Sequence, residues 1–309
     1  MIHVIDVQSR ATIQDLGRFG LRRFGISQCG AMDKLALRTG NILLGNAEDA
    51  PAIEVPLGGI TLQFQQDMNF CVTGAFYEMT LDDKPVFAYW RYQARAGQVL
   101  KMIRAKIGMY GYLCVQGGFT LPQELNSCST DLRAQIGGIE GRGLQVGDQL
   151  QTVNDPILRS EIGIAPIPLK HTIHALPSSE YQAFKRKSQY YWWRSKWTLQ
   201  SSSDRMGYRF QGQKLELKQP LEMLSHAIQF GSVQVPPSGQ PIILMADAQT
   251  TGGYPKIANV IDADLGALAQ VRLGSTIQFE AVSLEQAAKL RRKNEIYLDQ
   301  IRRIVDEKN

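Results

Sequence analysis

Short runs of alternating apolar and polar residues dominate this chain. In residues 52–105 they include AIEVPL, ITLQF, PVFAYW and QVLKMIRA, bounded by glycine, proline or aspartate. A period of two is typical of half-buried strands. Similar runs return after residue 204, so the pattern predicts a mainly β chain of the β-rich α+β class.

Two stretches have helical spacing instead. Residues 31–46 carry leucines and an isoleucine at helical spacing, with Asp33 near the expected start, where a helix favours negative charge. Near the other terminus, Ser283 and Gln286 form a capping box, which predicts an amphipathic C-terminal helix. Its expected apolar stripe consists of Ala287, Leu290, Tyr297, Ile301 and Ile304.

A boundary between two lobes is expected in residues 155–180. Prolines and a shift in polarity interrupt the β pattern there. We therefore divide the chain into residues 1–165, a β-rich lobe with an early helix, and residues 166–309, a second β lobe with the terminal helix. Just after the boundary, Ser179 and Gln182 predict another capping box and a short helix.

One strand-entry pattern recurs along the chain. Gly97, Gly147 and Gly274 each precede an alternating run, in RAGQVLKM, QVGDQLQT and RLGSTIQF. A glycine before a strand is a turn signal, because glycine adopts positive φ without strain. We expect a turn followed by a strand at each position.

Composition changes this picture little. The 309 residues are 44% hydrophobic and 20% charged, which is ordinary for a globular protein. No run is long and apolar enough for a membrane span and no signal peptide is evident, so we expect a cytoplasmic protein without a membrane partner. The charge of +5 is dispersed, and the basic and aromatic stretch 184–197 fits a lobe or subunit anchor better than nucleic-acid binding.

Cysteine and histidine offer no metal template. Cys29, Cys71, Cys114 and Cys128 form no C-x-x-C pair and are expected to be reduced thiols. Cys29 precedes Gly30 in a polar loop, where we expect it to be accessible. No metal site is expected, and no phosphate-binding P-loop or nucleophile elbow is present.

The segment DAQTTGGYPKIA, residues 247–258, is unusually rich in polar chemistry. It lies between apolar runs at 242–246 and 257–261, which predicts a hairpin. Paired glycines at positive φ would direct N–H groups toward an anion, and a lysine ammonium would bind a carboxylate, carbamate or phosphate. The alternative is an ordinary solvated glycine turn. The candidate catalytic residues are Lys256, Asp247 and Tyr254, with Gln249, Thr250, Thr251, Gly252 and Gly253 for substrate binding.

Two further polar clusters are candidates. TIQDLGR brings together Gln14, Asp15 and Arg18, and SDRMGYR brings together Arg205 and Arg209 beside an aspartate. Arginine pairs bidentately with carboxylates, so Asp15 and Arg18 are expected chiefly to brace the fold. A binding site also needs rigid support, so bracing and substrate binding are compatible.

These motifs together resemble one family. TIQDLGRFG, CGAMDKLALR, IEVPLGG, STDL, SDRMGYR, PPSGQPIILMADAQTTGGYPKIA and AQVRLG are similar to the biotin-dependent carboxyltransferase family. That family contains allophanate hydrolase subunit 2, the carboxyltransferase region of urea carboxylase and the C subunits of bacterial 5-oxoprolinases. GISQCGAMD, NSCSTDL and WRSKWTLQ resemble the 5-oxoprolinase branch more than the urea branch.

The resemblance implies a cyclophilin-like β-barrel and subunits A and B as partners. With ATP, and with Mg at the level of the complex, the subunits would open 5-oxoproline to L-glutamate; no covalent biotin is expected on this chain. Asp33, Gln14, Arg18, Arg205 and Arg209 then become candidate substrate-binding residues beside the 247–256 group. The alternatives are a regulatory protein that antagonises a sensor-kinase inhibitor, and the carboxyltransferase component of a biotin-dependent urea or amide carboxylase.

Overall fold

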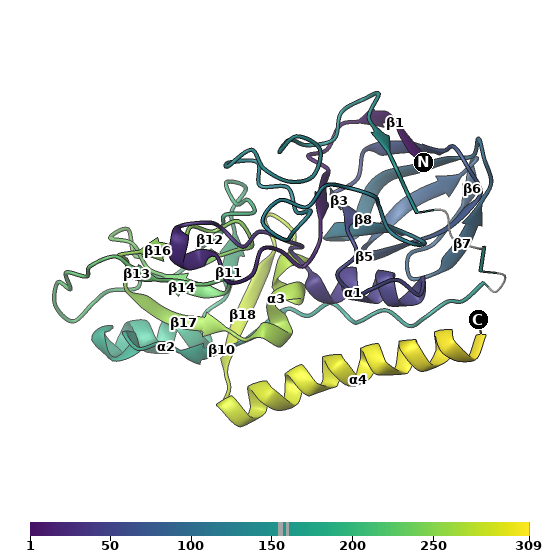
Figure 1. The fold of residues 1–309 in the computed structure, drawn as a ribbon. Helices are drawn as coiled ribbons and strands as arrows, with labels where there is room; N and C mark the ends of the chain where they lie inside the picture. Colours follow the sequence, from purple (N-terminus) through teal and green to yellow (C-terminus); the bar gives the residue numbers. More distant parts are fainter. Residues whose placement is uncertain (154–156, 159–160, 309) are drawn as a thin grey trace. The chain divides into compact units, whose positions relative to one another are not determined.

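The chain gathers into two compact units that interleave along the sequence. The computed structural model describes residues 1–153, 157–158 and 161–308 (Figure 1). Unit 1 comprises residues 1–18, 29–168 and 294–309, and unit 2 comprises residues 19–28 and 169–293. The division into two lobes at residue 165 stays a prediction, and part of the expected boundary lies outside the described residues.

Unit 1 is built on one antiparallel sheet of nine strands that curls around its core (Figure 1). The path runs β2-β3-β8-β4-β1-β9, and β5 pairs with β6, β7 and β8. The strands are β1 (Ile2–Val7), β2 (Thr12–Gln14), β3 (Ala52–Pro56), β4 (Ile60–Phe64), β5 (Met68–Leu81), β6 (Lys84–Pro85), β7 (Arg91–Ala94), β8 (Val99–Val115) and β9 (Gln149–Leu150).

Apolar alternation along these strands produces the core of unit 1. In β4 the pattern ITLQF buries every second residue, and Ile60, Leu62 and Phe64 all join one hydrophobic cluster. The early helix forms as predicted, as α1 (Lys34–Leu43), and Asp33 is its N-cap, with the carboxylate accepting a hydrogen bond from the Ala36 N–H.

The C-terminal helix, α4 (Leu284–Lys308), begins at the predicted capping box. Gln286 N–H donates to Ser283 Oγ, and Ser283 N–H donates to Gln286 Oε1. The predicted apolar stripe is partly wrong, because Ile304 is 41% exposed. The buried residues of this helix are Leu298, Ile301 and Val305.

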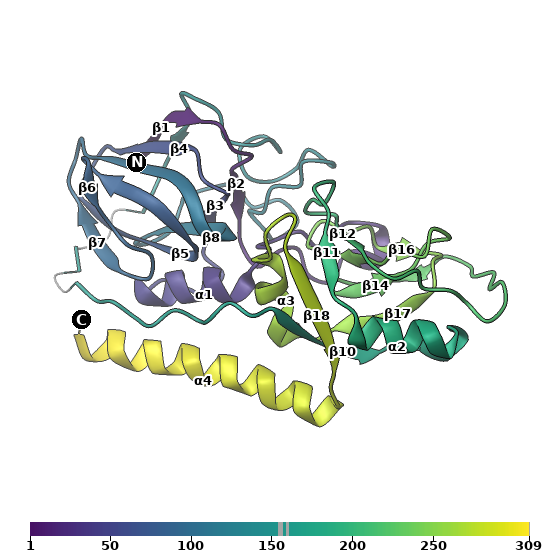
Figure 2. The same cartoon turned by 180° about the vertical axis from the view of Figure 1, so that it is seen from behind.

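Unit 2 is a closed barrel with strand order β10-β17-β14-β15-β12-β11-β18 (Figure 2). Its strands are β10 (Thr172–Pro177), β11 (Trp197–Leu199), β12 (Gly207–Gln211), β14 (Ser232–Gln234), β15 (Ile242–Leu244), β17 (Lys256–Val260) and β18 (Thr276–Ala281). A small separate sheet pairs β13 (His226–Ala227) with β16 (Thr251–Gly252). The helical elements are η1 (Arg22–Phe24), η2 (Tyr181–Ala183), α2 (Arg186–Arg194) and α3 (Asp262–Ala269). The predicted mainly β fold with a barrel and a C-terminal helix is therefore confirmed.

The basic and aromatic stretch 184–197 fixes α2 to the barrel. Trp192 stacks on Phe279 of β18 with 4.2 Å between ring centroids, and Trp197 is fully buried beside it. These rings belong to the core, as the anchor interpretation expected.

The capping box predicted at Ser179 and Gln182 is wrong, because the Ser179 hydroxyl instead donates to the Glu180 carboxylate.

The three strand-entry glycines are confirmed. Gly97, Gly147 and Gly274 have φ of 88°, 93° and 81°, and each comes two residues before a strand, β8, β9 and β18 respectively.

The accessibility expected for Cys29 is wrong, since its side chain is 1% exposed. None of the described helices is long and apolar enough to cross a membrane.

Candidate active site

The segment 247–255 is a connection across the barrel and not the hairpin that the sequence predicted. The strands on either side of it, β15 and β17, do not pair with each other, because each pairs with β14 between them. Because the segment is not a tight turn, it has room for a short strand, β16. This strand pairs with β13, and His226 lies opposite Gly252. Two segments more than twenty residues apart in sequence thus meet at the start of β17.

The paired glycines serve close packing. Neither Gly252 nor Gly253 is among the described residues at positive φ, so the expected N–H nest does not form. A Cβ on Gly252 would lie 2.6 Å from Gln234 Nε2 and 3.0 Å from Ile228 Cδ1. Glycine is needed there because neighbouring side chains occupy the space of a side chain.

Lys256 is the centre of a buried polar cluster in unit 2. The residue is 8% exposed, and its ammonium lies 3.0 Å from Glu180 Oε2. The same carboxylate oxygen accepts a hydrogen bond of 3.1 Å from the Lys256 backbone N–H. On its other side, the ammonium contacts Nε2 of His226. Lys256 is therefore held by a carboxylate and directed at an imidazole.

The protonation states of this cluster follow from its contacts. Burial would raise the pKa of Glu180, but hydrogen bonds from Ser179 and Lys256 outweigh burial and the net pKa is lowered. Nδ1 of His226 lies 3.2 Å from the Leu224 carbonyl oxygen. Because a carbonyl only accepts, Nδ1 carries a hydrogen directed at Leu224, and Nε2 is the ring nitrogen that faces Lys256.

Gln234 adds a donor without a partner. It lies on β14 opposite Lys256 in the strand register and is 3% exposed. Among the residues that the structure describes, its Nε2 has no hydrogen-bond partner, and it points toward Gly252. A buried amide donor in this state is destabilising unless water or a ligand accepts its hydrogen bond.

Asp247 is a bracing residue in this structure. Its two carboxylate oxygens accept from Nε and a terminal nitrogen of Arg205 at 2.8 and 2.7 Å. Both oxygens of the carboxylate are thus engaged with one guanidinium in a bidentate pair. The pairing fixes the start of the 247–255 segment, so Asp247 positions the site through Arg205.

The remaining candidates, in the 247–255 segment and on β12, are more exposed. Tyr254 is 47% exposed, and the side chains of Gln249, Thr251 and Arg209 are exposed while Thr250 is half-buried. Residues 19–28, which belong to the same unit, attach to this segment. Arg22 donates to the carbonyl oxygens of Ile228 and Gln249, and the Ser27 hydroxyl donates to Ala248 O at 3.3 Å.

The candidates in unit 1 form their own network. Asp15 accepts hydrogen bonds from Gly17 N–H, Cys128 N–H and the hydroxyls of Ser127 and Ser129. The expected pairing of Asp15 with Arg18 is therefore replaced by a loop of hydrogen-bond donors. Burial, with a smaller effect of Asp15, raises the pKa of the Cys128 thiol to about 11, so this thiol is protonated near neutral pH.

Gln14 and Arg18 are both fully buried in unit 1. Gln14 donates to Thr12 Oγ1 and to Thr130 O, and Arg18 Nε donates to the Glu124 carbonyl. The terminal nitrogens of Arg18 have no hydrogen-bond partner among the described residues. Both residues stay candidate binding groups, whereas the carboxylate of Asp33 is engaged as the cap of α1.

Sequence reasoning missed Glu180, His226 and Gln234. Glu180 lies in a stretch where a helix cap was expected, and its neighbour Ser179 was the only signal there. His226 lies in a polar loop without a motif, and Gln234 lies in a strand pattern where alternation predicts only burial. No local pattern links these three residues to Lys256.

Chemically, the Lys256 cluster can hold a developing negative charge and move a proton. A fixed ammonium and an unpartnered amide N–H are suitable donors for an oxyanion, and imidazole is the side chain most often used in proton transfer.

In the part of the chain that the structure describes, no three His, Cys, Asp or Glu side chains gather closely enough to hold a metal ion. His174 instead bonds to Asp264 through Nδ1 at 2.7 Å.

Comparison with known proteins shows which family this chain belongs to. The model of the carboxyltransferase domain, subdomain A and B, matches residues 24–281, a range that contains Glu180, His226, Gln234 and Lys256. The chain belongs to the carboxyltransferase domain family. The resemblance inferred from the sequence motifs is confirmed.

Two relatives of this carboxyltransferase domain match along nearly their whole length. A Haemophilus influenzae protein (strain Rd), named as the C subunit of 5-oxoprolinase, is 91% identical over 309 residues, which is all of both chains. The Escherichia coli K12 protein of the same name is 48% identical over 307 residues, 97% of each chain. Among solved structures, the urea amidolyase of K. lactis has a TM-score of 0.90 at 26% identity, covering 97% of this chain and 20% of that protein.

Proposed function

We propose that this carboxyltransferase-domain protein acts as the C subunit of an ATP-dependent 5-oxoprolinase. With subunits A and B it would open the lactam of 5-oxoproline to give L-glutamate. The observation that carries the proposal is the 91% identity, over the full length of both chains, with a protein named as the C subunit of 5-oxoprolinase. At that identity, a different fold or a different barrel site is not expected.

The Lys256 cluster suits the chemistry of a lactam. A lactam is a stabilised amide, so ring opening requires a more electrophilic carbonyl and donors that hold the developing oxyanion. Lys256, fixed by Glu180 at 3.0 Å, supplies the positive charge, and the Gln234 amide supplies a second donor. His226 is placed against Lys256 to take or return a proton. Tyr254 and Thr250 would contact the substrate from the adjoining segment.

ATP with Mg²⁺ would act at the level of the complete complex, and biotin would not be attached to this chain. The lysine in VLKM, Lys101, is the one whose strand setting faintly resembles a biotin-acceptor hairpin. Its ammonium lies 2.8 Å from the Asp83 carboxylate, in an exposed ion pair of unit 1. In the proposed complex, any activating group comes from ATP or from another protein.

The test is reconstitution of the complex. We expect this chain alone to give negligible turnover, and the mixture with subunits A and B to release glutamate from 5-oxoproline only when ATP is present. Lys256→Ala should lower kcat by at least about a hundredfold, because one preset oxyanion donor commonly contributes that much. The matched control is Lys289→Ala, an exposed lysine of the same unit, which should retain full activity.

Biotin-dependent amide carboxylation is the second candidate, favoured by the fold shared with urea amidolyase. The two are separated by adding avidin to the reconstituted mixture. Turnover that avidin leaves unchanged supports the 5-oxoprolinase reaction, whereas avidin-sensitive turnover with urea supports the carboxylase. No glutamate from the complete mixture, with all three subunits folded and associated, would overturn the proposal.

A further inference from the structure

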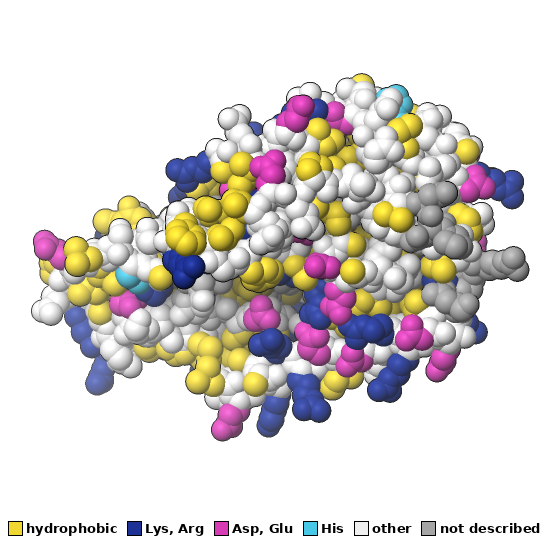
Figure 3. All heavy atoms as spheres, in the orientation of Figure 1, with side chains coloured by type: hydrophobic (Ala, Val, Ile, Leu, Met, Phe, Trp, Pro, Cys, Tyr) yellow, Lys and Arg dark blue, Asp and Glu magenta, His cyan; other side chains and the backbone are white. Residues whose placement is uncertain are grey.

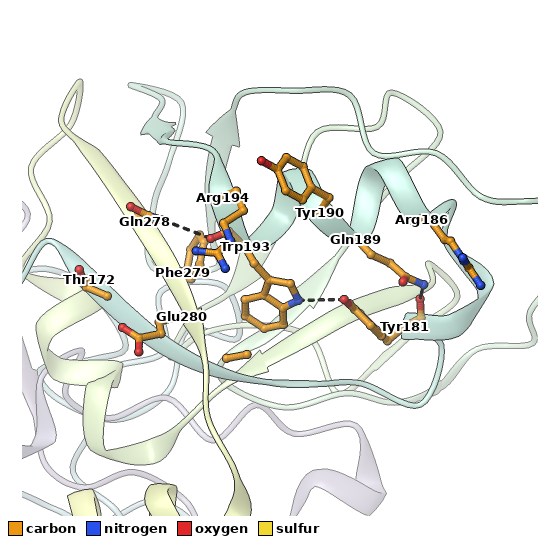
Figure 4. Close-up of a pocket in the computed structure, with 11 residues that line it drawn as sticks. Thr172, Tyr181, Arg186, Gln189, Tyr190, Trp193, Arg194, Gln278, Phe279 and Glu280 are labelled. Atoms are coloured by element: carbon orange, nitrogen blue, oxygen red, sulfur yellow. Dashed lines mark hydrogen bonds between the residues drawn. The ribbon is translucent and has the colours of Figure 1, made fainter.

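A cavity of about 830 Å³ lies in unit 2, beside α2 and β18, and none of the residues of the Lys256 cluster lines it (Figure 4). Figure 4 shows α2 along one side and β18 along the other, with Trp193 directed between them. The residues that define its chemistry are Arg186, Tyr190, Trp193, Arg194, Tyr181 and Gln278. None of these residues was among the candidates for substrate binding.

Several polar groups of the cavity are already engaged inside the protein. Trp193 Nε1 donates to Tyr181 Oη at 2.9 Å, and Gln278 Nε2 donates to the Trp193 carbonyl at 3.3 Å. Gln189 Nε2 likewise donates to the carbonyl oxygens of Tyr181 and Phe184. These bonds hold the aromatic wall in place and leave those three donor groups satisfied.

The groups that remain for recognition are two guanidinium groups, the Glu280 carboxylate and aromatic surface. Arg186 and Arg194 are exposed, and neither forms an ion pair with any residue that the structure describes. Tyr190, between them on the same side of α2, is 63% exposed. Arginine, tyrosine and tryptophan are the residues most enriched at the energetic centres of protein interfaces.

The spacing of the two arginines limits the shape of the occupant. Arg186 and Arg194 are eight positions apart in α2, which corresponds to about 12 Å along the helix axis. An extended peptide covers that length with about four residues. A nucleotide, in contrast, carries its phosphates together at one end of the molecule, so its negative charge would meet only one of the two arginines.

We propose that this cavity receives an extended acidic segment of the partner B subunit, with two carboxylates about four residues apart and an apolar side chain between them. The carboxylates would pair with Arg186 and Arg194, and the apolar side chain would pack on Tyr190 and Trp193. Glu280 also lines the cavity, so the segment carries a neutral or basic side chain where it faces Glu280.

This surface is an anchor within a larger interface. A stable interface buries roughly 800 Å² on each partner, more than one cavity of this size supplies. Charged side chains at such a rim act mainly on the association rate, and a central aromatic side chain acts mainly on dissociation. The two contributions can therefore be separated kinetically.

The proposal rests on the proposed role in the 5-oxoprolinase complex, and its test measures binding without substrate. The full chain is titrated with the purified B subunit in surface plasmon resonance at several salt concentrations. The double variant Arg186→Glu/Arg194→Glu should slow association at least about tenfold and flatten its dependence on salt. Tyr190→Ala should speed dissociation about tenfold. Lys187→Glu reverses a charge on the same helix outside the cavity, and it should leave both rates unchanged.

The opposite results would overturn the proposal. These are unchanged rates for the double variant, an equal effect of Lys187→Glu, or no association of the unaltered chain with the B subunit. Loss of ATP binding in the double variant, with association of the two chains intact, would assign the cavity to a nucleotide instead. Normal association combined with no glutamate formation would leave the docking surface standing and remove the 5-oxoprolinase reaction.

Discussion

Single side chains in the Lys256 cluster depend on one another for their position. Glu180 binds both the backbone N–H and the ammonium of Lys256, so one carboxylate fixes the start of β17 and the direction of its lysine. Removing Glu180 leaves a buried ammonium with an imidazole as its nearest contact. A buried charge without its partner is more destabilising than the intact pair is stabilising.

We expect Glu180→Gln to destabilise unit 2 by about 1–3 kcal/mol near neutral pH. Because the pKa of Glu180 is lowered from its ordinary value of 4.5, the stabilisation is complete above 4.5 and is lost as the pH falls through the lower folded-state pKa. Urea unfolding of variant and parent should therefore differ at neutral pH and converge in acid. The exposed Glu222→Gln is the control, and a difference that persists in acid would contradict the ion-pair account.

At the scale of elements, the loops that connect the strands form part of the polar networks. The 127–141 loop supplies the donors that hold Asp15, and five of its residues between 135 and 141 lie at positive φ, two of them not glycine. Such a path is specified by contacts with the rest of unit 1, because left-handed backbone is unfavourable for most residues. The 247–255 segment is fixed in the same manner, by the Arg205 to Asp247 pair and by β13.

Two glycines of unit 1 test this view. Gly137 has φ of 71°, and a Cβ there would lie 2.1 Å from Ser129 O and 2.4 Å from a terminal nitrogen of Arg18. Gly97 has φ of 88° with nothing within 4 Å. We expect Gly97→Ala to cost about 1 kcal/mol from backbone strain alone, and Gly137→Ala to cost more than about 3 kcal/mol. Thermal unfolding should show a larger loss of stability for Gly137→Ala than for Gly97→Ala. Equal losses of stability would refute the argument from crowding.

At the scale of the whole molecule, the last residues complete unit 1. Arg38 of α1 forms two hydrogen bonds of 2.8 Å to the Glu295 carboxylate, and Glu48 contacts both Arg38 and Arg302. Figure 3 shows side chains of both charges along α4. Tyr297 Oη also donates to the Ala165 carbonyl at 2.9 Å. A segment that is last in the sequence is therefore part of the first unit.

Burial along α4 predicts how firmly this segment is held. Ile301 is buried and Ile304 is 41% exposed. Ile301→Ala should destabilise the packing of residues 294–308 by about 2–5 kcal/mol, and Ile304→Ala by less than about 0.5 kcal/mol. Limited proteolysis should release the C-terminal segment from the first variant only. Equal protection of both variants would show that the ion pairs, and not the apolar contacts, retain the helix.

The sequence by itself determined what depends on neighbouring residues. Alternation predicted the strands of both units, the capping box placed the start of α4 at Ser283, and three turn glycines marked strand entries. These features depend on backbone geometry within a few residues, which local composition controls. The motifs were long and ordered enough to indicate the carboxyltransferase family, although they gave no geometry for its site.

The tertiary structure alone decided which side chains act together. Glu180 lies 76 residues and His226 lies 30 residues from Lys256 in sequence, yet both contact its ammonium. The same structure turned Asp247 into a brace and replaced the expected hairpin by a crossing over β14. Such contacts arise when the barrel closes in one register, and closure is set by packing over the whole core. No local pattern carries that information, because side chains far apart in sequence meet only after the strands have paired.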